Sequence, residues 1–330
     1  MEHSELLAAV RRPLSPDTQI EVQATREEYD NVQDIIEEEN VKFPRIHYDG
    51  TRQVAIVSAM PTPLHGEMVG QLLRTISRAV DKMPGLAESI KDGITIATDM
   101  RNTKDTGETP TTRNWDGALR YLTKDETGPS HTLMIAVEVG LSQTYASLRA
   151  AISYSVCALN CRVGIAMYIK EGNRSKRPSP KYYDTLEEKL AAVGAIENAL
   201  KSQLQAHPFG PLVVGEDTWF GTIASVALET SRKPPDEITP DTVLDPSQSF
   251  FKQAKFQIVE ESGFVAGEVP PNLAEITLGD CIPTHILRDN TIEETPVNFF
   301  YQDWFEGSFG SSMFQTAMER VMDKCRVRRS

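Results

Sequence analysis

Residues 133–142, Leu-Met-Ile-Ala-Val-Glu-Val-Gly-Leu-Ser, place one carboxylate, Glu138, inside an otherwise apolar run. The run is short, aliphatic and β-branched, which favours a buried strand, and Gly140 and Ser142 end it where a helix can begin. Burying an unpaired carboxylate is costly, so Glu138 is expected to bind a cation, take up a proton or pair. The alternative, in which Glu138 faces solvent from an edge strand or meets an arginine in a structural ion pair, stays open at this point.

The composition indicates a globular chain that can bury a full core. It has 330 residues, of which 40% are hydrophobic and 25% are charged. The formal net charge of −13 argues against coating of nucleic acid by bulk electrostatics, but it is compatible with a local basic cleft. No run approaches the ~18 apolar residues of a membrane span, and the N-terminus lacks the pattern of a secretory signal. We therefore expect an intracellular protein, in the cytoplasm or nucleus, with no membrane partner; the oligomeric state stays open.

Four cysteines are too few and too scattered for a disulfide framework: Cys157, Cys161, Cys281 and Cys325. The first two lack both the usual zinc-knuckle spacing and a second pair of ligands. We interpret all four as buried thiols.

Alternating strand and helix patterns predict a mixed central β-sheet flanked by helices, in an α+β or α/β fold. Helices are expected from Thr25, which begins a capping-box sequence, from His65, and after Ser142. Between Asp99 and Asn114 the sequence predicts an exposed polar loop. The clearest predicted strands span 52–60, 94–98, 115–122, 133–139 and 163–170. Weaker strand patterns cover 256–259 and 274–278, and two further helices are predicted at 184–206 and 309–325.

These patterns divide the chain into three parts. Residues 1–40 are predicted to form an acidic N-terminal arm with one helix. Residues 41–206 are predicted to form the core, and residues 207–330, which prolines break into short pieces, a mixed C-terminal extension that packs on it.

Two consecutive predicted strands each carry one acid, Asp116 at the entry of one and Glu138 inside the next. His65 and Glu67 lie in the first turn of a predicted helix. A carboxylate there is also explained by the positive end of the helix dipole, so Glu67 has a structural interpretation beside a functional one.

Taken together, these residues resemble the PD-(D/E)XK, restriction-endonuclease-like superfamily. The similarity rests on His65-Gly-Glu67, on Asp116, and on the run Ala-Val-Glu-Val-Gly-Leu-Ser-Gln-Thr-Tyr-Ala-Ser-Leu at 136–148. The last run is similar to the Glu-Val-Gly-x-Ser-x-x-Tyr-x-x-Leu pattern of a fungal, mostly uncharacterised branch. The resemblance covers about residues 40–170, and a weaker similarity is found at 278–283 and in the terminal helix.

The resemblance implies a metal-dependent nuclease that hydrolyses phosphodiester bonds. Asp116 and Glu138, with Glu67 as a third carboxylate, would hold Mg²⁺ or Mn²⁺, because hard cations prefer carboxylate oxygens. His65 would orient the attacking water or contact phosphate. Nucleic acid would enter through a local basic cleft lined by Arg113, Arg149 and Lys170.

The sequence also departs from the pattern of active members. The lysine expected two residues after the glutamate is replaced by Gly140. Arg149 in the next helix and Lys170 at the end of the next strand are the substitutes, and arginine is a poor base because it stays charged. Ala151 stands where the fungal pattern often has Asp, and Trp115 where a proline usually precedes the first acid.

Three hypotheses follow from the sequence. The first is a magnesium-dependent nuclease that uses Asp116 and Glu138, with catalysis that the missing lysine can impair. The second is a non-catalytic binding or accessory protein built on a nuclease fold. The third is an unrelated globular protein in which both acids are structural.

Overall fold

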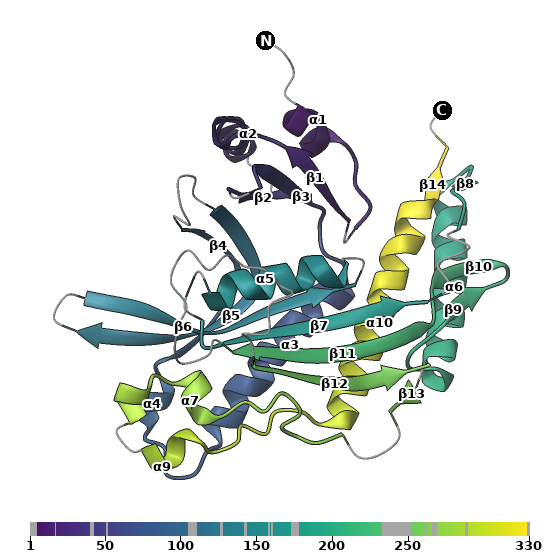
Figure 1. The fold of residues 1–330 in the computed structure, drawn as a ribbon. Helices are drawn as coiled ribbons and strands as arrows, with labels where there is room; N and C mark the ends of the chain where they lie inside the picture. Colours follow the sequence, from purple (N-terminus) through teal and green to yellow (C-terminus); the bar gives the residue numbers. More distant parts are fainter. Residues whose placement is uncertain are drawn as a thin grey trace.

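The computed structural model describes residues 5–328 except 17, 40–42, 51, 105–110, 126–127, 142–143, 158, 160, 173–177, 233–251, 262, 266–268 and 288–289. Its centre is a ten-stranded mixed sheet (Figure 1). Across the sheet the strands follow the order β1 (Gln19–Gln23), β3 (Val54–Ser58), β2 (Arg45–Asp49), β5 (Thr111–Asp125), β6 (Gly128–Gly140), β7 (Val163–Glu171), β11 (Ile223–Arg232), β12 (Lys252–Glu260) and β13 (Gly263–Phe264), while β4 (Ile94–Lys104) pairs with β5.

In the described ladders of this sheet, β6 and β7 pair in parallel and the others are antiparallel. A parallel pair needs a crossover connection, which here contains the helix α5 (Tyr145–Cys157). The expected α+β architecture, with a mixed sheet flanked by helices, is therefore confirmed. Among the described residues no helix is both long and apolar enough to span a membrane.

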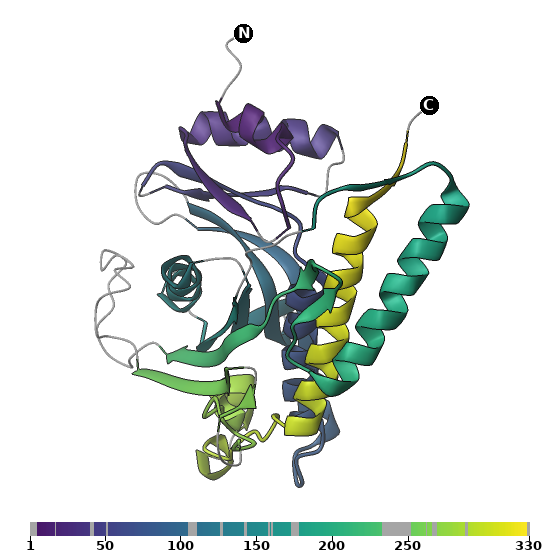
Figure 2. The same ribbon diagram turned by 90° about the vertical axis from the view of Figure 1, so that its right-hand side faces the viewer.

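The two faces of the sheet are covered differently. On one face lie α3 (Pro63–Asp81) and, beside it, α10 (Gln302–Lys324), with α6 (Leu186–Ala206) next to α10 (Figure 2). Alternate residues of the central strands, among them Val137 and Ile165, pack with these helices in the main core. On the opposite face α5 covers Ala166 of β7 with Leu148 and Ile152.

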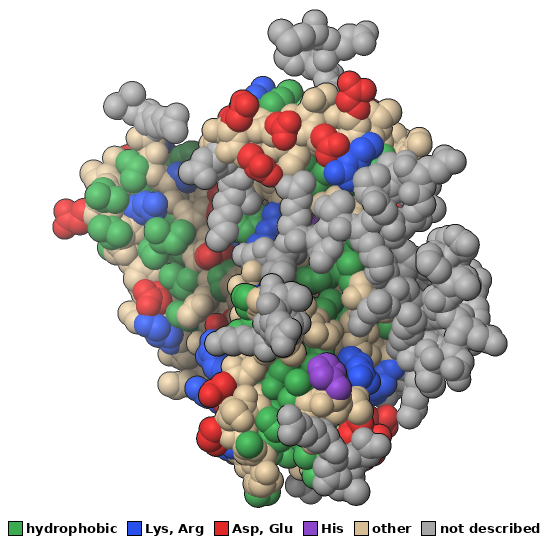
Figure 3. Space-filling view, turned by 90° about the vertical axis from the view of Figure 1, so that its left-hand side faces the viewer, with side chains coloured by type: hydrophobic (Ala, Val, Ile, Leu, Met, Phe, Trp, Pro, Cys, Tyr) green, Lys and Arg blue, Asp and Glu red, His purple; other side chains and the backbone are tan. Residues whose placement is uncertain are grey.

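The N-terminal segment forms a layer with its own small core. It contains α1 (Glu5–Arg11), β1 and α2 (Arg26–Glu38), so the arm has two helices and a strand where one helix was expected. The predicted capping box is confirmed, since Thr25 Oγ1 accepts from the Glu28 N–H while the Glu28 carboxylate accepts from the Thr25 N–H. Asp and Glu side chains gather over this layer (Figure 3), and its exposed acids include Glu27 and Glu37.

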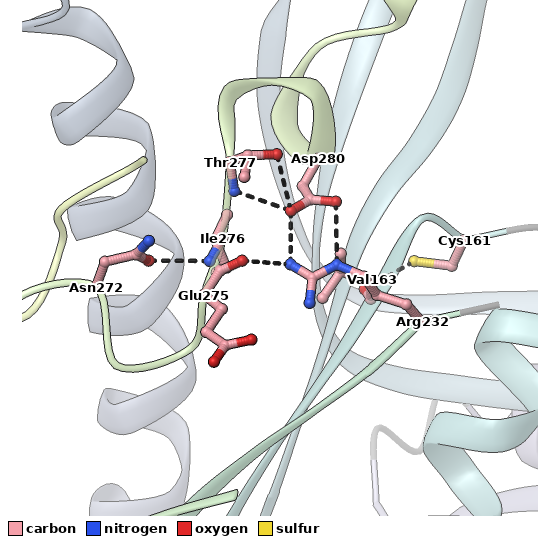
Figure 4. Close-up of polar contacts among 8 residues, drawn as sticks. All are labelled: Cys161, Val163, Arg232, Asn272, Glu275, Ile276, Thr277 and Asp280. Atoms are coloured by element: carbon pink, nitrogen blue, oxygen red, sulfur yellow. Dashed lines mark hydrogen bonds and ion pairs between the residues drawn. The ribbon is translucent and has the colours of Figure 1, made fainter. Parts of the chain in front are cut away.

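Three short helices follow β13: α7 (Leu278–Cys281), α8 (Thr284–Leu287) and α9 (Asn290–Glu293). A buried ion pair ties this segment to the sheet (Figure 4), because Arg232 at the end of β11 donates to both oxygens of Asp280, at 2.7 and 3.4 Å. Asp280 also accepts from the Thr277 N–H at 2.9 Å, and Arg232 donates to the backbone carbonyl of Glu275.

Smaller elements complete the fold. A parallel ribbon joins β8 (Lys181–Tyr183) to β14 (Cys325–Val327), a hairpin joins β9 (Leu212–Val214) to β10 (Asp217–Phe220), and α4 (Glu88–Lys91) precedes β4. Cys161, Cys281 and Cys325 are buried free thiols, as expected, and the Cys157 side chain lies outside the described residues.

Two local predictions were wrong. A polar loop was expected between residues 99 and 114, but residues 99–104 and 111–114 belong to the long paired strands β4 and β5, because backbone pairing, which extends to Lys104↔Thr111, does not require an apolar pattern. Residues 105–110 of this segment lie outside the described part of the chain. Residues 274–278 form no strand of the sheet; there the structure has an isolated bridge, Thr277↔Pro296, and the start of α7. The proposed domain boundaries at 40 and 206 stay predictions, but the sheet crosses both of them.

Candidate functional site

The candidate site lies where β5 and β6 separate. The ladder between these strands extends to Gly117↔Val137, and further along β5 the strand pairs with β2 at Tyr48↔Thr112. Asp116 is the residue of β5 at this fork. Its Oδ2 accepts a hydrogen bond from the backbone N–H of Val139 at 2.9 Å. The Asp116 side chain thus accepts a hydrogen bond from β6 that a backbone carbonyl would accept in a continuous ladder.

His65 reaches the same carboxylate from α3. Its Nε2 lies 2.9 Å from Asp116 Oδ2, and the two side chains are 14% and 19% exposed. Two hydrogen bonds hold the first turn of α3 in place. The hydroxyl of Thr62 accepts from the His65 N–H, and the hydroxyl of Thr316 on α10 accepts from the Leu64 N–H at 3.0 Å. The helix start therefore holds the imidazole at the fork.

Glu138 is the third member of the cluster. It is buried, with 6% of its surface exposed, and its side chain lies beside the Asp116 carboxyl group and helps to lower the pKa of that group. The two carboxyl groups that the sequence analysis singled out therefore lie side by side.

The electrostatics of Asp116 follow from these contacts. Burial is the largest single influence and opposes ionisation, but the groups around the carboxyl group, of which His65 acts most strongly, together hold the pKa of Asp116 below its usual value. The hydrogen bond from the Val139 N–H and the Glu138 side chain also lower this pKa. Asp116 is thus ionised near neutral pH.

We next asked whether these residues fit a divalent cation. In the described part of the chain, no set of three or more His, Cys, Asp and Glu side chains is arranged to hold a metal ion. A closed protein cage is therefore not formed there. Mg²⁺, however, is typically held by one or two carboxylates, with water and substrate phosphates completing its shell. Asp116 and Glu138 fit that open type of site, because a cation beside both would offset the repulsion between two neighbouring carboxylates.

Other expected residues lie elsewhere. Glu67 accepts a hydrogen bond from Gln71, one turn further along α3. His65 and Glu67 are two positions apart, and side chains with that spacing point to different sides of a helix. Lys170 is exposed. Glu138 pairs with Ala166 of β7, and Lys170 lies four residues, or about 13 Å, further along that strand. Gly140 pairs with Tyr168 of β7 and offers no side chain.

Arg149 has a different partner from the one expected. Its Nε lies 3.5 Å from Oε1 of Glu229, on β11, two strands away from Glu138. Tyr145 donates a hydrogen bond to the other oxygen of Glu229. Burial, followed by this contact, raises the pKa of Tyr145 to about 12. The Arg113 side chain and Ser142 lie outside the described residues.

Glu229 is the residue that sequence reasoning missed. Its segment, Ile-Ala-Ser-Val-Ala-Leu-Glu-Thr at 223–230, carries the same signal as the Glu138 strand: one acid in a short apolar run. The acid is 5% exposed in the structure. Its position in the proline-rich last third of the chain concealed this pattern.

A separate groove of about 900 Å³ lies where the N-terminal segment meets α10. Met60, Phe314, Met318 and Met322 contribute to its apolar wall. His65, Asp116 and Glu138 do not line it, although Thr62 and Pro63 at the start of α3 do. The groove and the carboxyl pair are therefore different features of the surface.

No family model matches the chain, and no curated protein or solved structure matches it either.

Proposed function

We propose that the chain is a nuclease-like protein that holds a divalent cation on Asp116 and Glu138 and hydrolyses phosphodiester bonds slowly. The observation that carries the proposal is that these two carboxyl groups lie side by side at the fork of β5 and β6. Two buried carboxyl groups in contact repel each other unless a proton or a cation lies between them. The resemblance of residues 40–170 to the PD-(D/E)XK superfamily supports the same assignment.

Each residue of the cluster has a role in this proposal. The Val139 N–H fixes the orientation of the Asp116 carboxylate, and His65 stabilises its charge. Glu138 supplies the second oxygen ligand from the neighbouring strand. A bound Mg²⁺ or Mn²⁺ would neutralise charge on a phosphate and lower the pKa of a coordinated water.

Slow turnover is expected from the residues around the pair. Gly140 supplies no amine at the place where the superfamily has its lysine. The nearest substitute in sequence, Arg149, contacts Glu229 instead, and a guanidinium is in any case a poor proton acceptor. General acid–base catalysis typically contributes 10²–10⁴-fold, so its loss leaves a weak enzyme rather than an efficient one.

A cleavage assay tests this function. Labelled single- and double-stranded DNA and RNA are incubated with the full chain and Mn²⁺, and products are followed over hours. We expect slow cleavage that disappears in Asp116→Ala and Glu138→Ala and persists in Glu187→Ala, an exposed acid on α6. Cleavage that survives both site substitutions would refute the assignment.

One observation favours a second function, that of a non-catalytic accessory protein. Gly140 supplies no amine, and the Arg149 guanidinium lies against Glu229. If cation binding is intact but no substrate is cleaved, the site is retained and silent. If neither is observed, the accessory function is the better description.

A further inference from the structure

A second polar cluster lies under α5, built around Glu229. This carboxylate accepts from the Tyr145 hydroxyl and lies 3.5 Å from Arg149 Nε, both on the first turns of α5. The ring of Tyr145 also meets Tyr168 of β7 edge-on, with centroids 5.8 Å apart. The cluster is therefore fixed by two strands and one helix.

Two cations share the ring of Tyr145. The guanidinium carbon of Arg149 lies 5.8 Å from the ring centroid, and Lys255 Nζ of β12 lies 5.0 Å from it. In the described part of the chain Lys255 forms no ion pair with a carboxylate. One carboxylate, Glu229, thus faces two positive charges. This spot has an excess positive charge on a chain whose formal net charge is −13.

The cluster is aligned with the candidate metal site. Glu138 on β6 is the strand partner of Ala166 on β7, and Ala166 is the partner of Glu229 on β11. Directly opposed residues share a face of the sheet, and neighbouring strands are 4.7–4.9 Å apart, so Glu138 and Glu229 are separated by about 10 Å. Lys255, the partner of Glu229 on β12, continues the row. Lys255 is exposed, and the Arg149 side chain is 24% exposed, so an anion can reach both.

We propose that Arg149 and Lys255 form a subsite for a backbone phosphate of single-stranded nucleic acid, with Tyr145 and Glu229 as positioning residues. The inference rests on the proposed function, because it assigns the flanking part of the same substrate. A single strand fits better than a duplex, since duplex binding neutralises many phosphates on two strands and requires a broad basic surface. A cation pair beside tyrosines is the arrangement that single-strand binders use.

The test measures binding without cleavage. A fluorescein-labelled 12-nucleotide oligothymidine is titrated with the full chain in EDTA and low salt, and anisotropy is recorded. Lys255→Glu is expected to weaken binding about tenfold. Lys255→Met removes one phosphate contact, so the plot of log affinity against log salt should become less steep by about 0.7. Lys201→Glu, an exposed lysine of α6 on the other side of the sheet, makes the same charge change and is expected to have little effect.

The outcomes separate the subsite from the metal site. Equal weakening by Lys255→Glu and Lys201→Glu would overturn the subsite, because net charge alone would then explain binding. Tighter binding of a duplex of the same length would also overturn it. Because EDTA removes divalent cations, either failure is independent of cation binding at Asp116 and Glu138, which calorimetry measures separately. Lys255 is exposed, so its substitutions are expected to fold, and circular dichroism verifies this.

Discussion

Nε2 of His65 lies 2.9 Å from Oδ2 of Asp116, so the first turn of α3 is joined to the point where β5 and β6 part. The helix itself belongs to the main core, in which it packs beside α10. Burial of that apolar interface therefore determines where the imidazole stands. The chemistry of the fork depends on core packing as well as on its own strands.

Replacing Asp116 with Asn is expected to destabilise the protein in a pH-dependent way. The asparagine oxygen can still accept from the Val139 N–H, but the charge beside His65 is lost. At pH 7 we expect the free energy of unfolding to fall by about 1–3 kcal/mol. The folded-state pKa of Asp116 is below its usual value, so the wild-type advantage is complete above the ordinary Asp pKa of ~3.9 and is lost as the pH falls below it.

Urea denaturation of both proteins in EDTA, from pH 7 to pH 3, measures this difference. A gap that stays constant or widens toward pH 3 would show that the Asp116 charge contributes no stability.

Asp280→Asn is expected to destabilise the fold through the Arg232 pair. These side chains are only 12% and 19% exposed, and removing one partner of a buried pair leaves the other charge without compensation. The expected loss is about 3 kcal/mol by urea denaturation. The control is Asp184→Asn, whose pair with Arg328 is 69% and 67% exposed and should contribute about 0–1 kcal/mol. Similar losses in the two variants would contradict the structural role of the buried pair.

The buried thiols are expected to be unreactive in the native protein. Burial raises the pKa of Cys161 to about 12, and it also raises the pKa of Cys281. Because the thiolate is the reactive form, alkylation of both by iodoacetamide at pH 8 should be at least about 100-fold slower than in denaturant. Mass spectrometry of the labelled peptides gives both rates. Comparable rates before and after unfolding would mean that these sites open freely.

Elements with a strong local signal could be predicted from the sequence. The capping box at Thr25 and Glu28 needs only neighbours along the chain, and the apolar run around Glu138 identifies a buried strand without knowledge of the rest. The strand β11 could not be found in this way, because its run stands alone among prolines and its partners, β7 and β12, are distant or weakly patterned.

The candidate site was predictable only in part. Asp116 and Glu138 could be paired because neighbouring strands in the sequence often lie side by side. The contact of Arg149 with Glu229 joins residues 80 positions apart and depends on how α5 lies over β11, which no local pattern encodes. Glu67 shows the opposite error: its position in the sequence suggested a ligand, but helix geometry turns it away from His65.

Calorimetric titration of the full chain with Mn²⁺ and with Mg²⁺ tests most directly whether Asp116 and Glu138 form a cation site. We expect saturable binding to the wild type, loss of most of the affinity in Glu138→Ala, and unchanged binding in Glu187→Ala, which removes an exposed acid from α6. Absence of binding to the wild type, or equal binding to Glu138→Ala, would contradict the account.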